Sequence, residues 1–295
     1  MGSENKKIKN KGKSIRFRLL NISRETPYDY NTILSRYVQE RMLYRLSQSQ
    51  YRDQFFLKGG ALLYAYDQVV SRPTLDVDFL IKNMSNDKEH IKAVFKDILS
   101  ISFADDALTF DVDNMTVEDI MEEKIYHGIR LNVTAVMDGM KQPLSIDVGF
   151  GDVTIPSPHT LAYPVILDEM PAFSVNAYSL ETVVAEKFQT MITLSTYNSR
   201  MKDFYDLYTI LSSQALNEDD LIEAVRATFA NRNTHYTENH QLFKEDFFRD
   251  SIKMKQWNDF LKKIKYNGTL SFEDVGKCIQ KEMIPYWEAI STTQS

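Results

Sequence analysis

Asp76 and Asp78 are the residues of this chain whose type and spacing most clearly suggest chemistry. They lie in the apolar stretch 75–81, which predicts a β-strand. Alternate residues of a strand share a face, so the two carboxylates are expected to project together while their apolar neighbours Leu75, Val77 and Phe79 point into the core. Two like charges this close are stabilised by a divalent cation with oxygen ligands, and Mg²⁺ is the usual ion beside phosphate.

A third carboxylate, Asp147, lies in a second apolar stretch, Leu144–Phe150. Two strands that bring acids to one edge of a sheet can together supply the carboxylate ligands of a metal ion, so we predict that Asp76, Asp78 and Asp147 bind a metal. A solvated Asp-x-Asp on an edge strand is the commoner arrangement in general. The apolar flanks favour the metal site here, and weaker candidates for the third ligand are Asp111, Asp113 and Asp152.

A Lys58-Gly59-Gly60 turn precedes the acidic strand. It separates a predicted strand, 55–58, from a predicted helix, 61–66. Glycines before a helix let backbone N–H groups approach a phosphate, although a Gly-Gly turn is more often only a tight connection. The turn is not a P-loop, because the Gly-Lys-Ser/Thr signature is absent.

Basic and acidic residues of the second half could act on the same phosphates. Lys187 lies at the margin of the apolar face of a helix predicted from Ser179 to Leu194, where it is either a solvated partner of Glu186 or able to reach into a cleft. Asp206 lies on a helix predicted over 200–211 that packs closely. Arg72 either binds phosphate or pairs with an acid. The other ionic residues near Asp206 are interpreted as a surface network: Arg200, Lys202 and Asp203.

Five motifs in this order resemble the AbiEii/AbiGii family of toxin nucleotidyltransferases. They are LKGGALL from Leu57, RPTLDVDF from Arg72, IDVGFGD from Ile146, EK at Glu186 and RMKDFYDLY from Arg200. The resemblance covers most of residues 55–211. It implies a polymerase-β-like nucleotidyltransferase fold, a role as the toxin of a toxin–antitoxin pair or of an abortive-infection (phage-defence) locus, and nucleotide transfer to tRNA. A cognate antitoxin is expected to restrain the toxin.

The resemblance also implies roles for individual residues. Asp76, Asp78 and Asp147 would be catalytic metal ligands for Mg²⁺ or its substitute Mn²⁺, and Lys187 and Asp206 would complete the catalytic set. Gly59, Gly60 and Lys187 would bind the NTP. Apart from the resemblance, we also predict that Lys58 and Arg72 bind the nucleotide. An attacking RNA hydroxyl would displace pyrophosphate in line, activated by a second metal or by Asp147 as base.

The length and the distribution of patterns predict an α+β protein with a mixed sheet flanked by helices, followed by a mostly helical half. We expect a flexible basic tail at 1–20, a nucleotidyltransferase-like domain with an N-terminal helix at 21–155, and a helical domain at 156–295 that completes the active-site cleft. Further helices are predicted at 86–99, 219–229, 242–264 and 272–290, and two more strands within 129–148.

The composition limits the class of protein. The net charge of −6 argues against non-specific binding of nucleic acid over the whole surface, and the single cysteine, Cys278, fits a reducing cytoplasm. No apolar run approaches the ~20 residues that span a bilayer, so no membrane partner is expected. Two alternatives to nucleotidyl transfer remain, a metal-dependent nuclease and an inactive module that binds a protein or RNA. The nuclease is disfavoured because restriction-type nucleases have an acidic residue two positions before the active-site lysine, and the residue two positions before Lys187 is Ala185.

Overall fold

The computed structural model describes residues 10–67, 72–122 and 126–291. Contacts divide the chain into two units. The first unit consists of the described residues of Met1–Tyr66, Pro73–Gly151 and Thr160–Ala177, and the second of those of Asp67–Arg72, Asp152–His159 and Tyr178–Ser295. The predicted α+β class, with a mixed sheet and a helical C-terminal part, is confirmed.

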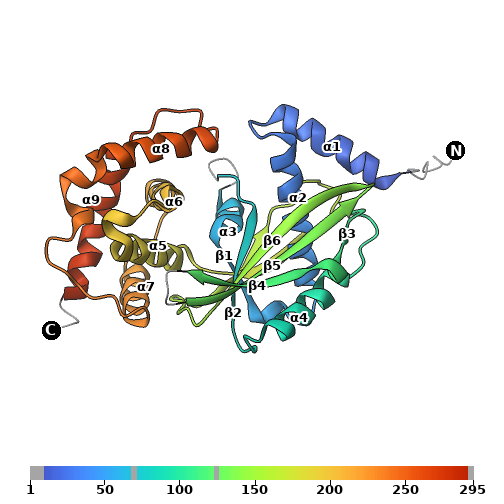
Figure 1. Ribbon diagram of the computed structural model, residues 1–295, viewed down its shortest axis with the longest axis horizontal. Helices are drawn as coiled ribbons and strands as arrows, with labels where there is room; N and C mark the ends of the chain where they lie inside the picture. Colours follow the sequence, from blue (N-terminus) through green and yellow to red (C-terminus); the bar gives the residue numbers. More distant parts are fainter. Residues whose placement is uncertain (1–9, 68–71, 123–125, 292–295) are drawn as a thin grey trace. The chain divides into compact units, whose positions relative to one another are not determined.

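An eight-stranded mixed sheet forms the centre of the first unit (Figure 1). Its order is β3-β5-β6-β2-β1-β8-β7. The short strand β3 pairs with the C-terminal part of β5, and β4 pairs with the preceding part of β5. β2 runs parallel to β6 and antiparallel to β1, while β5 and β6 form an antiparallel hairpin. The strands are β1 (Phe55–Lys58), β2 (Asp76–Ile81), β3 (Thr109–Phe110), β4 (Thr116–Glu122), β5 (Tyr126–Met137), β6 (Met140–Phe150), β7 (His159–Tyr163) and β8 (Phe173–Ala177).

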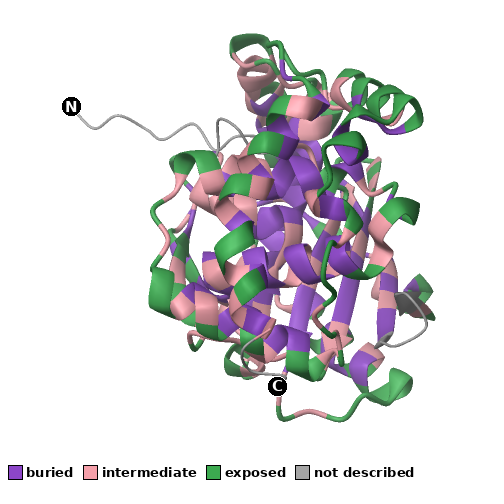
Figure 2. Ribbon diagram, turned by 90° about the vertical axis from the view of Figure 1, so that its left-hand side faces the viewer, coloured by how far each residue is buried: buried purple, intermediate pink, exposed green. Residues whose placement is uncertain are grey.

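Helices cover this sheet, and α2 packs against β6 and β8, α3 against β1 and β2, and α4 against β3 and β4. The side chains of Asp29 and Asp87 accept hydrogen bonds from N–H groups in the first turns of α2 and α4, those of Thr32 and His90, and so fix where these helices begin. The helices of the first unit are α1 (Lys11–Glu25), α2 (Tyr30–Ser47), α3 (Gly59–Tyr66) and α4 (Lys88–Ser100). Figure 2 shows that buried residues follow the strands and the helix faces packed on them.

The second unit is helical. Its helices are α5 (Leu180–Leu194), α6 (Met201–Ser213), α7 (Glu218–Asn231), α8 (Ser251–Lys263) and α9 (Phe272–Ser291). The predicted cap is confirmed at Ser179, whose side chain accepts from the N–H of Thr182. α5 packs on α6 and α7, and α9 closes the bundle through contacts with α6, α7 and α8. None of the described helices has the length and apolar character needed to cross a membrane.

The predicted flexible tail is wrong for its described part. Lys11 begins α1, and Ile15 and Leu19 are 1% and 0% exposed in the packing of this helix against α2. The segment is rich in lysine, but Ile15 and Leu19 are four positions apart and therefore share one face of a helix. Residues 1–9 lie outside the described residues.

Three further expectations differ from the structure. The region after 155 is not wholly helical, because β7 and β8 belong to the sheet of the first unit. Leu75 does not point into the core, because it precedes β2 and is 75% exposed. The helix predicted over 242–264 is interrupted, since Asp250 accepts a hydrogen bond from the N–H of Lys253 and starts α8 at Ser251.

Candidate active site

The sheet brings the three predicted metal ligands together. Asp76 and Asp78 project from one face of β2, and Asp78 stands directly beside Asp147 in the parallel pairing of β2 with β6. Asp76, Asp78 and Asp147 each offer a carboxylate oxygen, and these oxygens lie within 4.8 Å of one another. A purely carboxylate donor set suits a hard divalent cation such as Mg²⁺ or Mn²⁺, so the residues fit the predicted metal.

A hydrogen bond from Thr74 orients the first ligand, Asp76. The Oγ1 atom of Thr74 donates to Oδ1 of Asp76 at 2.8 Å. Hydrogen-bond partners of this kind fix the direction of a carboxylate before a metal arrives.

Asp147 already has a cationic partner. The Nε and Nη2 atoms of Arg130 donate to its two carboxylate oxygens at 2.7 and 2.6 Å, a bidentate pair. Asp147 is 8% exposed, and its hydrogen bonds to Arg130 are the main reason why the pKa of Arg130 is raised. Arg130 was not identified from the sequence, since its role depends on a strand pairing that local patterns do not reveal.

Charged residues therefore form a row across four adjacent strands. Lys58 stands opposite Asp78, Asp78 beside Asp147, and Asp147 opposite Arg130. Directly paired residues point to the same face of a sheet, so the row presents two acids flanked by two bases. This arrangement reduces the repulsion between the two central carboxylates.

The glycine turn has a steric reason in the structure. Gly59 has a φ of +67°, and a Cβ atom at this position would lie 1.9 Å from Oδ2 of Asp78. A Cβ atom at Gly60 would lie 2.8 Å from that of Thr74. Both glycines thus leave room for the side chains that form the acidic cluster. Their predicted contact with phosphate stays a prediction.

A second ionic cluster lies within the second unit. Nζ of Lys187 on α5 donates to Asp203 and Asp206 on α6, each at 2.8 Å. Arg72 forms a bidentate pair with Asp206 at 2.9 Å for both bonds, and Arg200 donates to Asp203 at 2.7 Å. Three cations thus surround two carboxylates. Lys187, Asp206 and Arg72 were predicted site residues, and the structure brings them together.

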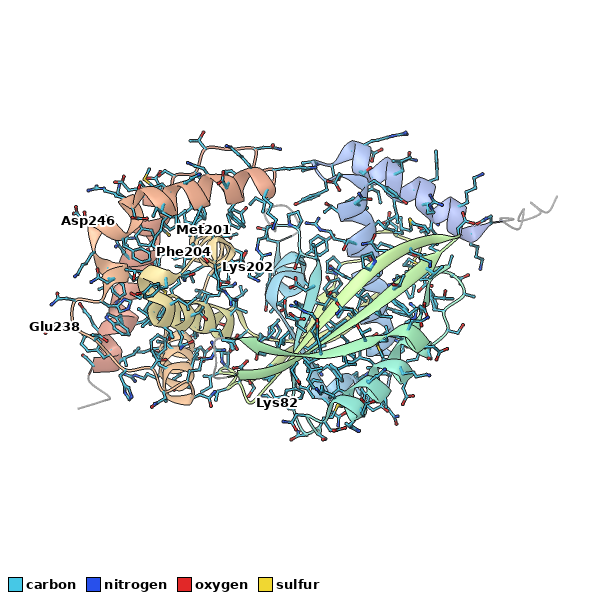
Figure 3. The ribbon with its side chains drawn as sticks, in the orientation of Figure 1. Lys82, Met201, Lys202, Phe204, Glu238 and Asp246 are labelled. Atoms are coloured by element: carbon cyan, nitrogen blue, oxygen red, sulfur yellow. The ribbon has the colours of Figure 1, made fainter. Side chains whose placement is uncertain are left out.

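The interpretation of Arg200 and Asp203 as a surface network is wrong. Asp203 is 3% exposed, and the side chain of Lys187 is 12% exposed. Burial by itself would raise the pKa of Asp203, but the charges of Lys187 and Arg200 outweigh it and hold that pKa below its usual value. Lys202, marked on α6 in Figure 3, is the member of the predicted network that is exposed.

Comparison with known proteins decides the class. The family model described as "Nucleotidyl transferase AbiEii toxin, Type IV TA system" matches residues 41–281, which is most of the chain. The chain belongs to the AbiEii family. It is therefore a nucleotidyltransferase and a toxin of the type IV toxin–antitoxin class, for which the family implies an NTP substrate, a divalent metal and an antitoxin partner.

A solved structure at low sequence identity shares the fold of this AbiEii protein. JHP933 from Helicobacter pylori has a TM-score of 0.50 at 12% sequence identity, and the match covers 89% of this chain and 94% of that one. A candidate nucleotidyltransferase from H. pylori has a TM-score of 0.48 at 12% identity, covering 90% of this chain and 99% of that one. No curated protein matches the chain.

The family assignment selects among the alternatives drawn from the sequence. A nuclease and an inactive binding module were both compatible with clustered acids and a helical half. The AbiEii reaction is nucleotidyl transfer, and the model spans both the acidic cluster and the ionic cluster of the second unit. The three carboxylates that converge on β2 and β6 could hold a divalent metal ion for such a reaction.

Proposed function

We propose that this AbiEii protein transfers a nucleoside monophosphate from an NTP to a hydroxyl of RNA, with tRNA as the acceptor, and that Mg²⁺ held by Asp76, Asp78 and Asp147 is required. The observation that carries the metal requirement is the meeting of these three carboxylates within 4.8 Å. Mn²⁺ is expected to substitute for Mg²⁺, because both ions prefer oxygen ligands.

The metal would neutralise the phosphates and position the attacking hydroxyl. The chain's own residues orient the reaction. Asp76 and Asp78 present their carboxylates from one face of β2, with Asp76 held by Thr74. Gly59 and Gly60 begin α3, and their backbone N–H groups would approach the triphosphate, while Lys58 would neutralise charge beside Asp78.

We also assign the NTP phosphates to Arg72 and Lys187. Arg72 and Lys187 both pair with Asp206, so one carboxylate holds the two cations together. Guanidinium and ammonium groups are the side-chain groups that bind phosphate oxygens most strongly. Asp206 would then keep Arg72 and Lys187 in position. That the helical half completes the catalytic cleft stays a prediction.

The direct test incubates purified protein with total RNA, Mg²⁺ and each of the four α-³²P-labelled NTPs. We expect one or more NTPs to label RNA of tRNA size, and Asp78→Asn to abolish the labelling. Cleavage of the RNA without labelling would instead support the nuclease. Absence of both labelling and cleavage, with no effect of expression on growth, would refute the proposal.

The toxin assignment predicts a biological counterpart. Expression of the wild-type protein should arrest growth, and co-expression of its cognate antitoxin should restore it. The NTP and the tRNA acceptor are both cytoplasmic compounds, so we place the reaction in the cytoplasm. Growth arrest that persists in Asp78→Asn would show that the toxicity does not come from nucleotide transfer.

A further inference from the structure

Arg130 lies between two carboxylates on the face of the sheet that carries the acidic cluster. On one side, β5 pairs with β6 and places Asp147 opposite Arg130. On the other side, β5 pairs with β4 and places Glu118 opposite Arg130. Directly opposed residues of antiparallel strands have Cβ atoms roughly 4.5–5.5 Å apart and point the same way. Both acids are therefore within reach of one guanidinium group.

The two possible partners of Arg130 are used unequally. Asp147 receives both hydrogen bonds of the bidentate pair, and each of its oxygens is engaged. Glu118 is exposed, and its Oε1 atom accepts a hydrogen bond from Nδ2 of Asn132 at 3.4 Å, close to the limit for such a bond. The side chain of Arg130 is 36% exposed, so it has solvent on one side into which it can turn.

A cation at the acidic cluster would compete with this arrangement. Asp147 is one of the three residues whose oxygens meet there. A divalent ion bound to Asp147 would meet the positive charge of Arg130 across a single carboxylate, and two like charges at that separation repel each other. A turn of Arg130 toward Glu118 would reduce this repulsion and would keep the guanidinium paired.

We propose that Arg130 is a positioning residue that holds Asp147 in the metal-free protein, competes with the divalent ion for this carboxylate, and turns toward Glu118 as the ion binds. Arg130 thereby sets the metal concentration at which the acidic cluster fills. The inference rests on the proposed metal site and adds its regulation. A permanent supporting role, in which Arg130 keeps Asp147 aimed at the metal, would have the opposite effect on metal affinity.

The test measures the affinity of the full chain for Mn²⁺ alone by isothermal titration calorimetry, without nucleotide or RNA. Arg130→Met removes the competing charge and is expected to bind Mn²⁺ about tenfold more tightly than wild type. Glu118→Gln removes the second partner and is expected to bind about threefold more weakly. The double variant should match Arg130→Met, because Glu118 acts only through Arg130.

Other outcomes overturn the proposal. Unchanged or weaker binding by Arg130→Met would show that Arg130 supports the metal ligand. An equal effect of Glu118→Gln with and without Arg130 would show that the glutamate acts independently. If Arg130→Met does not fold, Arg130→Lys keeps the charge but loses the bidentate geometry, and the proposal then requires Mn²⁺ affinity above that of wild type.

Thermal unfolding separates this inference from the proposed function. Mn²⁺ should raise the melting temperature of Arg130→Met by more than that of wild type, since tighter binding to the folded state gives a larger shift. A wild-type protein that binds no Mn²⁺ would refute the metal site and the competition together. A wild-type protein that binds Mn²⁺ with the same affinity as Arg130→Met would refute the competition alone.

Discussion

Replacing Gly59 with alanine should damage the acidic cluster through a single carbon atom. Gly59 has a φ of +67°, where a side chain is strained by roughly 1–2 kcal/mol. The added Cβ would lie 1.9 Å from Oδ2 of Asp78, whereas real Cβ atoms essentially never come closer than 3.0 Å to another atom. Asp78 must therefore retreat by about 1 Å or the turn must shift. Overpacking of this kind costs about 1–3 kcal/mol more.

The turn of the β5–β6 hairpin provides a matched control. Gly139 has a φ of +76°, and a Cβ atom there would meet nothing within 4 Å. Gly139→Ala should therefore cost only the backbone strain of roughly 1–2 kcal/mol. Gly59→Ala should cost about 2–5 kcal/mol, measured by urea denaturation, and should also lower nucleotide transfer by about 10²-fold, because catalysis is sensitive to displacements near 1 Å.

A double-mutant cycle isolates the contact between the two residues. In an Asp78→Gly background the new methyl group meets no carboxylate, so Gly59→Ala should then cost no more than Gly139→Ala. The coupling free energy is expected to be about 1–3 kcal/mol. Equal destabilisation by Gly59→Ala in both backgrounds, or equal effects of Gly59→Ala and Gly139→Ala on transfer, would refute the steric reasoning.

Three further substitutions test separate parts of the chain. Asp76→Asn should abolish nucleotide transfer and the Mn²⁺-induced rise in melting temperature. Without metal, the melting temperature should stay the same or rise, because the variant has one fewer carboxylate in the acidic cluster and less repulsion. A folding defect would contradict this expectation. Lys187→Met should destabilise the protein by about 3 kcal/mol in urea, since it breaks buried ion pairs, and an unchanged midpoint would contradict their structural role. Burial lowers the pKa of His240 in the folded protein, despite its hydrogen bond with the carbonyl of Ile192. The free energy of unfolding should therefore fall as the pH drops below 6.5, the pKa of histidine in the unfolded chain, and should level off below the pKa of folded His240. Measured by urea denaturation, His240→Gln should remove this pH dependence.

The strand, turn, helix and acidic strand between 55 and 81 could be predicted because each depends on local sequence. The structure gives β1, α3 and β2 in this order, within one or two residues of the expected bounds. Asp147 was also found locally, from an acid within an apolar stretch. Its position beside Asp78 depends on the parallel pairing of β2 with β6, which two similar stretches suggest but do not define.

The ionic partners were harder to predict than the acids. Arg200 and Asp203 are three residues apart on a helix, a spacing typical of exposed pairs, and only the tertiary contact with Lys187 buries Asp203. β7 and β8 were missed because prolines surround them, and proline weakens a strand pattern even where the strand forms. Asp250 is of a residue type that commonly caps helices, but the apolar periodicity on both sides of it favoured one long helix.

The alternation of charge across the sheet explains how the acidic cluster tolerates its own formation. Without counter-charges, three converging carboxylates would repel one another and favour the unfolded chain at neutral pH. Lys58 and Arg130 stand at the two ends of the row that contains Asp78 and Asp147, so the strand pairing that assembles the metal ligands also supplies their counter-charges. The same pairing places Glu118 beyond Arg130. Folding without metal and responsiveness to metal therefore follow from one sheet register, and a slip by one residue would remove both.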